Sequence, residues 1–125
     1  MSVPADLKYT AEHEWIRVEG DEVVIGVTDF AQGELGDVVF IEIETEGETL
    51  SKGETFGTIE AVKTVSDLYM PVDGEVIEVN SALEDTPELV NSEPFKGGWM
   101  IRIKLSDLSQ LDDLMGADEY NALIG

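Results

Sequence analysis

The sequence of 125 residues contains no cysteine and a single histidine, His13. Without cysteine the chain cannot form disulfides, thiolate zinc sites or iron–sulfur clusters, and it has no cysteine nucleophile. One histidine also argues against a histidine-rich metal site. Basic residues are few: 7 Lys and Arg stand against 28 Asp and Glu, which gives a formal charge of −21 at pH 7. This balance excludes the clustered basic residues that bind nucleic acids or anionic membranes.

Long apolar runs are missing as well. No segment approaches the roughly 20 apolar residues that span a bilayer, and the first residues lack the basic and apolar regions of a signal peptide. We therefore expect a cytoplasmic protein of a prokaryote, with no membrane partner. The length and the hydrophobic content of 42% predict one folded domain over residues 1–125 rather than a disordered acidic tail.

Short segments rich in Val, Ile and aromatic residues fill the first two thirds of the chain and predict β-strands separated by glycine-containing turns. The predicted strands are Glu14–Val18, Glu22–Val27, Asp37–Glu44, Thr55–Val62, Val65–Met70, Glu75–Asn80 and Met100–Leu105. A short helix is expected over residues 28–36, capped by Thr28 or Asp29 and ended by Gly36. Another is expected over residues 83–90, where Pro87 limits its length. The similarity of residues 36–42 to residues 74–80 suggests a sandwich of two related halves.

The C-terminal segment changes character. Ser106 can cap a helix that Gly116 ends, and a last short helix is predicted over Ala117–Ile124. The first of these helices carries an apolar stripe of Leu108, Leu111, Leu114 and Met115. Such a stripe at helical spacing predicts core packing rather than a cofactor site.

The central segment, residues 57–74, reads as strand, tight turn and strand, with Lys63 at or next to the turn. A lysine at a hairpin tip is ordinarily a solvated surface residue. Here only five lysines exist in the chain, and the neighbours of Lys63 are small or β-branched. An amine on a stiff, uncluttered tip suits modification by a second protein. It does not suit a Schiff-base lysine, which desolvation activates.

The sequence resembles the H protein family of the glycine cleavage system, whose members carry a lipoyl group. The similar blocks follow in the same order over nearly the whole chain. They are residues 7–9, 13–15, 26–29, 31–32, 35–40, 60–63, 66–67, 71–76, 79–80, 97–100 and 116–120, and they include Glu60-Ala61-Val62-Lys63. The resemblance implies a mainly β fold of the barrel-sandwich hybrid type, like other lipoyl and biotinyl carriers, with short helices and a C-terminal helical segment.

The resemblance also implies a function. Lys63 would carry lipoate as an amide, and the chain would be a carrier, not an enzyme. Its implied partners are a pyridoxal-phosphate glycine decarboxylase, a tetrahydrofolate-dependent aminomethyltransferase, an FAD-dependent dihydrolipoyl dehydrogenase and a lipoyl-attaching enzyme. The carrier is expected to be a monomer. The cofactor would supply the chemistry, while the protein presents and protects it.

The resemblance gives roles to four further residues. Glu60 and Gly74 would be recognised by the lipoyl-attaching enzyme. The structural alternatives are an exposed strand carboxylate for Glu60 and a turn glycine for Gly74, which explains Gly74 at least as well, and both readings can hold together. Glu14 would hold the ammonium of the loaded arm in a cleft through a charge-assisted hydrogen bond, and Asp67 is a weaker candidate for the same cleft. The relatives carry His or Asp in the segment where this chain has Phe30, Gly33 and Glu34, so the polarity of its cleft is left open.

Three other functions remain in view. A biotin carrier shares the fold, but its lysine lies between methionines, whereas Val62 and Thr64 flank Lys63. A lipoyl relay would donate lipoate to other acceptor proteins. An enzyme would use Glu14, His13 and Asp67, but no nucleophile–base–orienter set can be assembled from their spacing. His13 is expected to be a structural residue at a strand end. The acidity would suit docking to basic partner surfaces, a high-salt cytoplasm or simple solubility.

Overall fold

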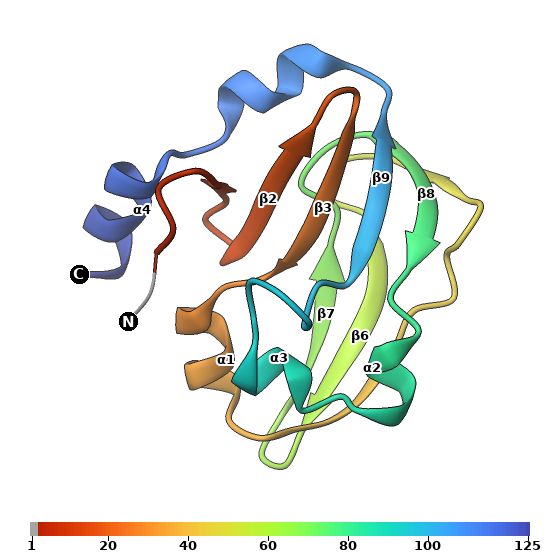
Figure 1. Cartoon of the computed structure of the whole chain (residues 1–125), viewed down its shortest axis with the longest axis vertical. Coiled ribbons are helices and arrows are strands. Elements are labelled where there is room, and N and C mark those ends of the chain that lie inside the picture. Colours follow the sequence, from red (N-terminus) through yellow and green to blue (C-terminus); the bar gives the residue numbers. More distant parts are fainter. Residues whose placement is uncertain (1–2) are drawn as a thin grey trace.

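The computed structural model describes residues 3–125 and shows two antiparallel sheets packed face to face (Figure 1). The larger sheet contains, in spatial order, β1 (Lys8–Tyr9), β2 (Glu14–Glu19), β3 (Glu22–Val27), β9 (Ile101–Leu105), β8 (Gly74–Val79) and β5 (Thr49–Leu50). The smaller sheet contains β4 (Val38–Glu42), β6 (Thr55–Ala61) and β7 (Val65–Tyr69). This mainly β sandwich with short helices is the fold class that the sequence predicts.

All seven predicted strands are present, with ends that differ by at most two residues. The two-residue strands β1 and β5 were not predicted, because two residues are too short to show alternation. The two similar sequence segments form β4 and β8, which lie in different sheets. The similarity thus corresponds to one strand in each layer of the sandwich.

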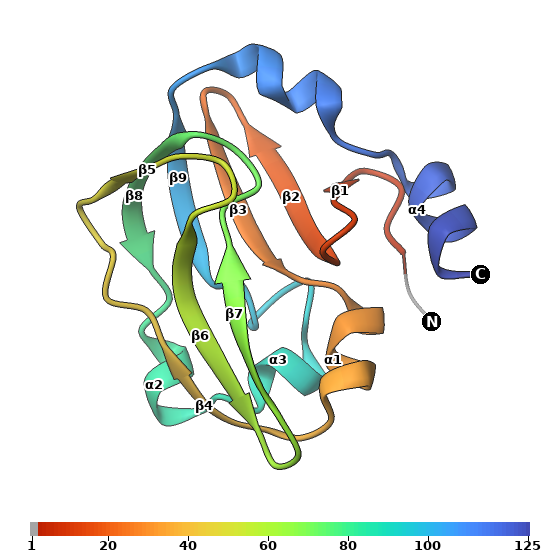
Figure 2. The same ribbon diagram turned by 180° about the vertical axis from the view of Figure 1, so that it is seen from behind.

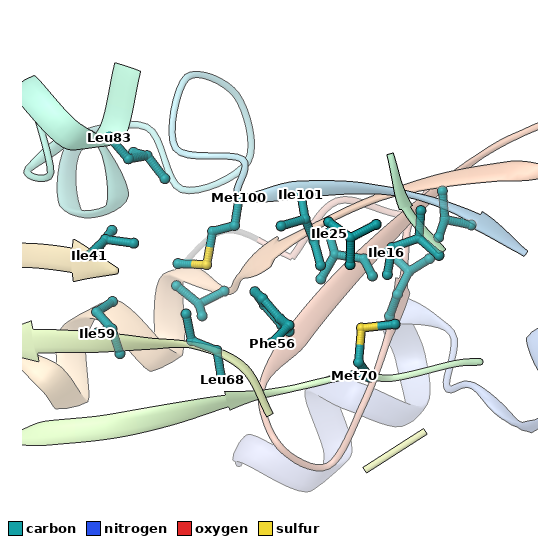
Figure 3. Packing of buried hydrophobic residues seen from close by; sticks show 14 of the residues in the cluster. Ile16, Ile25, Ile41, Phe56, Ile59, Leu68, Met70, Leu83, Met100 and Ile101 are labelled. Carbon is teal, nitrogen blue, oxygen red and sulfur yellow. The ribbon is translucent and has the colours of Figure 1, made fainter. Parts of the chain in front are cut away.

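The main hydrophobic core lies between the two sheets. Side chains from β2, β3 and β9 meet those of β4, β6 and β7, as Figure 3 shows. The labelled members are Ile16, Ile25, Ile41, Phe56, Ile59, Leu68, Met70, Leu83, Met100 and Ile101, all buried. Leu83 comes from a short helix and closes one end. Each fully buried aliphatic or aromatic side chain contributes roughly 1.5–3 kcal/mol, so this layer holds the sheets together.

A second cluster covers the other face of the larger sheet. Successive strand residues point to opposite faces, so Ile16 enters the main core while Trp15 enters this second cluster. The rings of Tyr9 and Tyr120 stack there at 4.7 Å with an interplanar angle of 9°. β2 and β3 are therefore buried on both faces near Trp15, which explains the continuous apolar residues Val23–Val27 of β3.

Three short helices lie at the edges of the sandwich: α1 (Asp29–Leu35), α2 (Ala82–Asp85) and α3 (Leu89–Ser92). Thr28 caps α1 by accepting a hydrogen bond from the Ala31 amide at 3.1 Å, and Gly36 ends it with a φ of 80°. The helix predicted over residues 83–90 is instead two short helices that flank Pro87. Proline removes an amide donor and interrupts the helix there.

The predicted cap at Ser106 is wrong. Asp107 caps the following segment by accepting from the Ser109 amide at 2.9 Å, and that segment, Leu108–Asp113, is a 3₁₀ helix. Residues three apart lie one above another in a 3₁₀ helix, and Leu111 and Leu114 pack against the main core as predicted, whereas Leu108 at the start is exposed. The last helix, α4 (Ala117–Ile124), has its predicted bounds and packs beside β1 (Figure 2).

Candidate functional site

Lys63 lies at the tip of the β6–β7 hairpin, as the sequence predicts. The hairpin projects beyond the short helices in both views (Figures 1 and 2). Its tip closes through a hydrogen bond from the Ala61 amide to the Thr64 carbonyl at 2.8 Å. Lys63 is exposed and makes no ion pair within residues 3–125. Its amine is therefore open to a second protein.

The backbone at the end of α1 supports the lysine. Gly36 has a positive φ of 80°, and a Cβ placed there would lie 3.3 Å from Cε of Lys63. The amide of Val62 donates to the Asp37 carbonyl at 3.0 Å, which ties the tip to the segment after α1. A glycine at this position thus allows the turn and leaves room for the aliphatic part of the lysine side chain.

A hollow of about 500 Å³ extends between α1 and β7. Its walls are lined by apolar side chains and by acids. The apolar lining consists of Val27, Ala31, Leu35, Ile59, Val65 and Leu68. The end of the hollow nearest the hairpin tip is lined by Val65, which begins β7 two residues after Lys63. The hollow reaches Glu12, His13 and Glu14 at its other end. We call it the arm groove.

Glu14 is a buried carboxylate with an exposed fraction of 4% at this far end of the arm groove. The Thr10 hydroxyl donates to its Oε1 at 3.0 Å, and the backbone amide of Tyr69 also donates to it. Burial raises the pKa of Glu14 to about 7, against these two hydrogen bonds and with help from the nearby Glu12. No ion-pair partner of Glu14 exists in residues 3–125. A cation that enters the groove would meet an uncompensated carboxylate.

A second hollow, of about 680 Å³, borders Glu14 from the other side. It shares Glu12, Glu14 and Tyr69 with the arm groove, and Lys52 and Asp113 also line it. Its lining includes no residue of the hairpin tip. Of these two hollows, the arm groove is the one with a lining residue, Val65, two positions from Lys63.

Asp67 and Glu34 line the middle of the arm groove, and both are exposed. Phe30 does not add polarity to the groove, because its ring packs on the His13 ring with centroids 4.7 Å apart. Gly33 is exposed on α1. The groove therefore has mainly apolar walls, with the exposed carboxylates of Glu34 and Asp67 at its edges.

Glu60 lies on the outer face of the smaller sheet, one row from the tip. Phe40 on β4 and Val65 on β7 are its direct cross-strand partners. Both are unusually exposed for apolar residues, at 45% and 64%. Glu60 is exposed between them. This row of a carboxylate flanked by two apolar side chains adjoins Lys63.

Gly74 is not a turn glycine, which corrects one of the two readings of the sequence. It is the buried first residue of β8 and pairs with Leu50 and Leu105. A Cβ there would overlap Cγ2 of Ile103 and the carbonyl oxygen of Lys104. Close approach of the neighbouring strand, and not a positive φ, requires glycine.

The structure adds residues that the sequence did not single out. Thr10 holds Glu14 from the turn before β2, and Tyr120 of α4 lies 2.9 Å from Nδ1 of His13. His13 has a positive φ of 66°, as a structural corner residue just before β2. A threonine four residues before an acid carries no recognisable signal, and Tyr120 is 107 residues from His13 in the chain.

The whole chain is similar to known proteins. The sequence model described as "Glycine cleavage H-protein" matches residues 7–125. The glycine cleavage system H protein of Staphylococcus carnosus is 55% identical over 125 residues, which cover all of this chain and 99% of that protein. The corresponding protein of Bacteroides thetaiotaomicron is 57% identical over 124 residues, covering 99% and 98%.

A solved structure is similar as well. The crystal structure of a glycine cleavage system H protein from Mycobacterium marinum superposes with a TM-score of 0.89 at 39% identity, covering 98% of this chain and 99% of that one. Within residues 3–125 no helix is both long and apolar enough to cross a membrane. On the family match and these full-length relatives, the chain belongs to the glycine cleavage H-protein family.

Proposed function

We propose that the chain is the lipoyl-bearing carrier of a glycine cleavage system, acting as one cytoplasmic domain over residues 1–125 and as a monomer, without catalysis of its own. Lipoate would be bound as an amide to Nζ of Lys63. The observation that carries the proposal is the arm groove, which extends from Val65, two residues from the exposed Lys63, to the buried carboxylate of Glu14. The partners would be glycine decarboxylase, aminomethyltransferase, dihydrolipoyl dehydrogenase and the lipoyl-attaching enzyme.

The residues at the hairpin tip fit a lipoyl group. Lys63 offers an amine that is exposed and free of ion pairs in the described part of the chain. The aliphatic side chains that line the arm groove, such as Leu35 and Ile59, suit an alkyl chain. Glu14 lines the end of the groove that is farther from the hairpin tip. When bound, the group would supply a dithiolane that accepts and returns an aminomethyl group and two electrons.

Glu14 would hold the ammonium of the loaded arm. A carboxylate has about four acceptor positions, and Thr10 and the Tyr69 amide use two of them. The rest remain for a cation, and burial strengthens the resulting charge-assisted hydrogen bond. Because the pKa of Glu14 is about 7, an ammonium beside it would favour the ionised form at neutral pH. Asp67 would add a weaker attraction from its exposed place along the groove.

The row of Phe40, Glu60 and Val65 supports a recognition role for Glu60. A partner with a basic group between two apolar contacts would match this row and would place its active site at Lys63. Gly74 would serve recognition indirectly, because it lets β8 and β9 approach closely. We expect the lipoyl-attaching enzyme to bind this row of three residues.

Intact-mass measurement with fragment mapping tests the attachment site. The unmodified protein is incubated with lipoate, ATP and a lipoate–protein ligase that is active on another H protein. We expect one lipoyl increment, located on Lys63, and none on Lys63→Ala. Lys52→Ala is the matched control, because Lys52 is also an exposed lysine in a turn, and it should be modified like the wild type. No increment on the wild type would refute the assignment.

Steady-state acylation tests the recognition row. Glu60→Gln and Phe40→Ser should each lower kcat/KM of the ligase by about tenfold, the usual scale for a good interface contact. Glu48→Gln is the control, since Glu48 is an exposed carboxylate in the loop before β5. Equal rates for all three variants would show that the ligase does not read this row.

A further inference from the structure

A closed triangle of hydrogen bonds joins His13, Thr28 and Tyr120. The Thr28 amide donates to the His13 carbonyl at 3.0 Å. The Tyr120 hydroxyl lies 2.7 Å from Oγ1 of Thr28 and 2.9 Å from Nδ1 of His13. Thr28 and Tyr120 are buried, so the bond between their hydroxyls is shielded from water, while the bond to His13 is partly buried.

The triangle connects the end of the arm groove to one of its sides. His13 precedes Glu14 in the chain, and both line the end of the groove, which we call the Glu14 wall. Thr28 is the N-cap of α1, and α1 supplies the adjoining α1 wall through Ala31 and Leu35. One phenolic hydroxyl, from helix α4, thus contacts residues of both walls.

The ring that carries this hydroxyl is itself fixed. Tyr120 is fully buried and stacks on Tyr9 at 4.7 Å. Tyr9 is held by two backbone hydrogen bonds with Met115, at 2.8 and 2.9 Å, just before α4 begins. The hydroxyl therefore has a defined position against which the walls are set.

The Glu14 wall needs such support because its corner is strained. His13 adopts a φ of 66°, in the left-handed region that is unfavourable for residues other than glycine. The turn that it closes includes Thr10, whose hydroxyl holds the Glu14 carboxylate. A release of the His13 side chain would let this turn relax, and the carboxylate would lose its fixed place.

We propose that Tyr120 is a positioning residue: its hydroxyl ties the Glu14 wall to the α1 wall and fixes the end of the arm groove where an amine would dock. This inference rests on the proposed function for the identity of what docks. The positioning itself is a property of the unmodified protein. It is therefore testable without lipoate.

The chain offers a matched pair of variants. Tyr120→Phe removes the hydroxyl and keeps the stacked ring. Tyr9→Phe removes the hydroxyl of the other ring in the same stack, which donates to the Pro4 carbonyl and not to the groove. Both variants delete one buried phenolic oxygen from the same cluster, so a general loss of stability would appear in both.

The readout is the titration of the Glu14 carboxyl carbon by NMR in the unmodified protein. In Tyr120→Phe we expect water to reach Glu14 and its pKa to move down by about half a pH unit or more toward the ordinary value. In Tyr9→Phe the pKa should stay within about 0.2 of the wild type. An unchanged Glu14 pKa in a folded Tyr120→Phe protein, or equal shifts in both variants, would overturn the inference.

A double-mutant cycle provides a second measurement. His13→Phe keeps an aromatic ring against Phe30 but removes the nitrogen that meets Tyr120. If the bond between the two side chains acts on Glu14, the two substitutions together should shift its pKa little more than either alone. Fully additive shifts would overturn the inference, and His13→Phe tests it alone if Tyr120→Phe does not fold.

Ammonia release from the lipoylated, glycine-charged protein links the inference to the proposed function. Tyr120→Phe should release ammonia about fivefold faster than the wild type, the scale of one lost hydrogen bond, and Tyr9→Phe should match the wild type. If the wild type itself gives no slower release than a free lipoyl peptide, docking at Glu14 is refuted. The NMR result on positioning would stand separately from that failure.

Discussion

The two ends of the arm groove differ in burial, bonding and charge. At the hairpin tip Val62 and Val65 expose 75% and 64% of their surface, and Lys63 has no ion pair in the described chain. At the far end Glu14 is buried, held by Thr10, and has a pKa of about 7. Attachment therefore needs access, whereas docking needs exclusion of water and fixed geometry. The proposed carrier function needs both, and opposite ends of β7 would supply them.

The largest effect is expected at the exposed end. Lys63→Arg keeps the charge but offers a guanidinium, which does not form the lipoyl amide, so acylation should be lost completely. Because the side chain is exposed, the free energy of unfolding should change by less than about 0.5 kcal/mol. Intact mass and chemical denaturation measure the two quantities. A large loss of stability would show that the tip is more constrained than its exposure indicates.

At the buried end, substitution of Glu14 should change the stability of the protein but not the attachment of lipoate to Lys63. The pKa of Glu14 is raised from 4.5 to about 7, so the folded state binds this proton more tightly than the unfolded state. This contribution is fully present below about pH 4.5 and is lost as the pH rises through 7. Glu14→Gln has no group that titrates at this position. Between pH 4 and pH 8 its free energy of unfolding should therefore rise by up to about 3 kcal/mol relative to that of the wild type.

Denaturation of both proteins at several pH values measures that difference. The comparison removes the general repulsion of an acidic chain, because both proteins share their other carboxylates. Acylation of Lys63 in Glu14→Gln should equal that of the wild type. A constant difference in stability across this pH range would show that Glu14 keeps an ordinary pKa.

A substitution at Gly74 tests whether this residue influences acylation of Lys63 only by stabilising the fold. Gly74→Ala would push a methyl group into Ile103 and the Lys104 carbonyl. We expect a loss of about 2 kcal/mol, or a Tm lower by about 8 °C. Acylation of the protein that remains folded should be nearly normal. A large loss of kcat/KM for acylation without a loss of stability would assign Gly74 to direct recognition.

Much of this comparison was predictable from the sequence. The alternating strands and the glycine-marked turns predict the hairpin and place Lys63 at its tip, because these signals are local. The resemblance names Glu14 and Glu60. The family assignment is confirmed by the relatives, while the roles of individual residues remain proposals.

The rest depends on contacts between distant parts of the chain. The burial that raises the pKa of Glu14 comes from strands and turns far apart in sequence, and the Tyr120 hydroxyl reaches Thr28 across 92 residues. The close approach at Gly74 appears only when β8 and β9 are paired. The Ser106 cap failed because Asp107 competes for the same role one residue later.

The smallest effect is expected between the two ends. Asp67 lines the arm groove but is exposed, so water and salt screen its charge within about 8 Å at physiological ionic strength. Asp67→Asn should speed ammonia release from the lipoylated, glycine-charged protein by less than about twofold. Glu14→Gln should speed it by about tenfold or more, because a buried charge-assisted bond is lost. If the two variants had equal effects, the attraction would be spread along the groove, and the contrast between its ends would not govern docking.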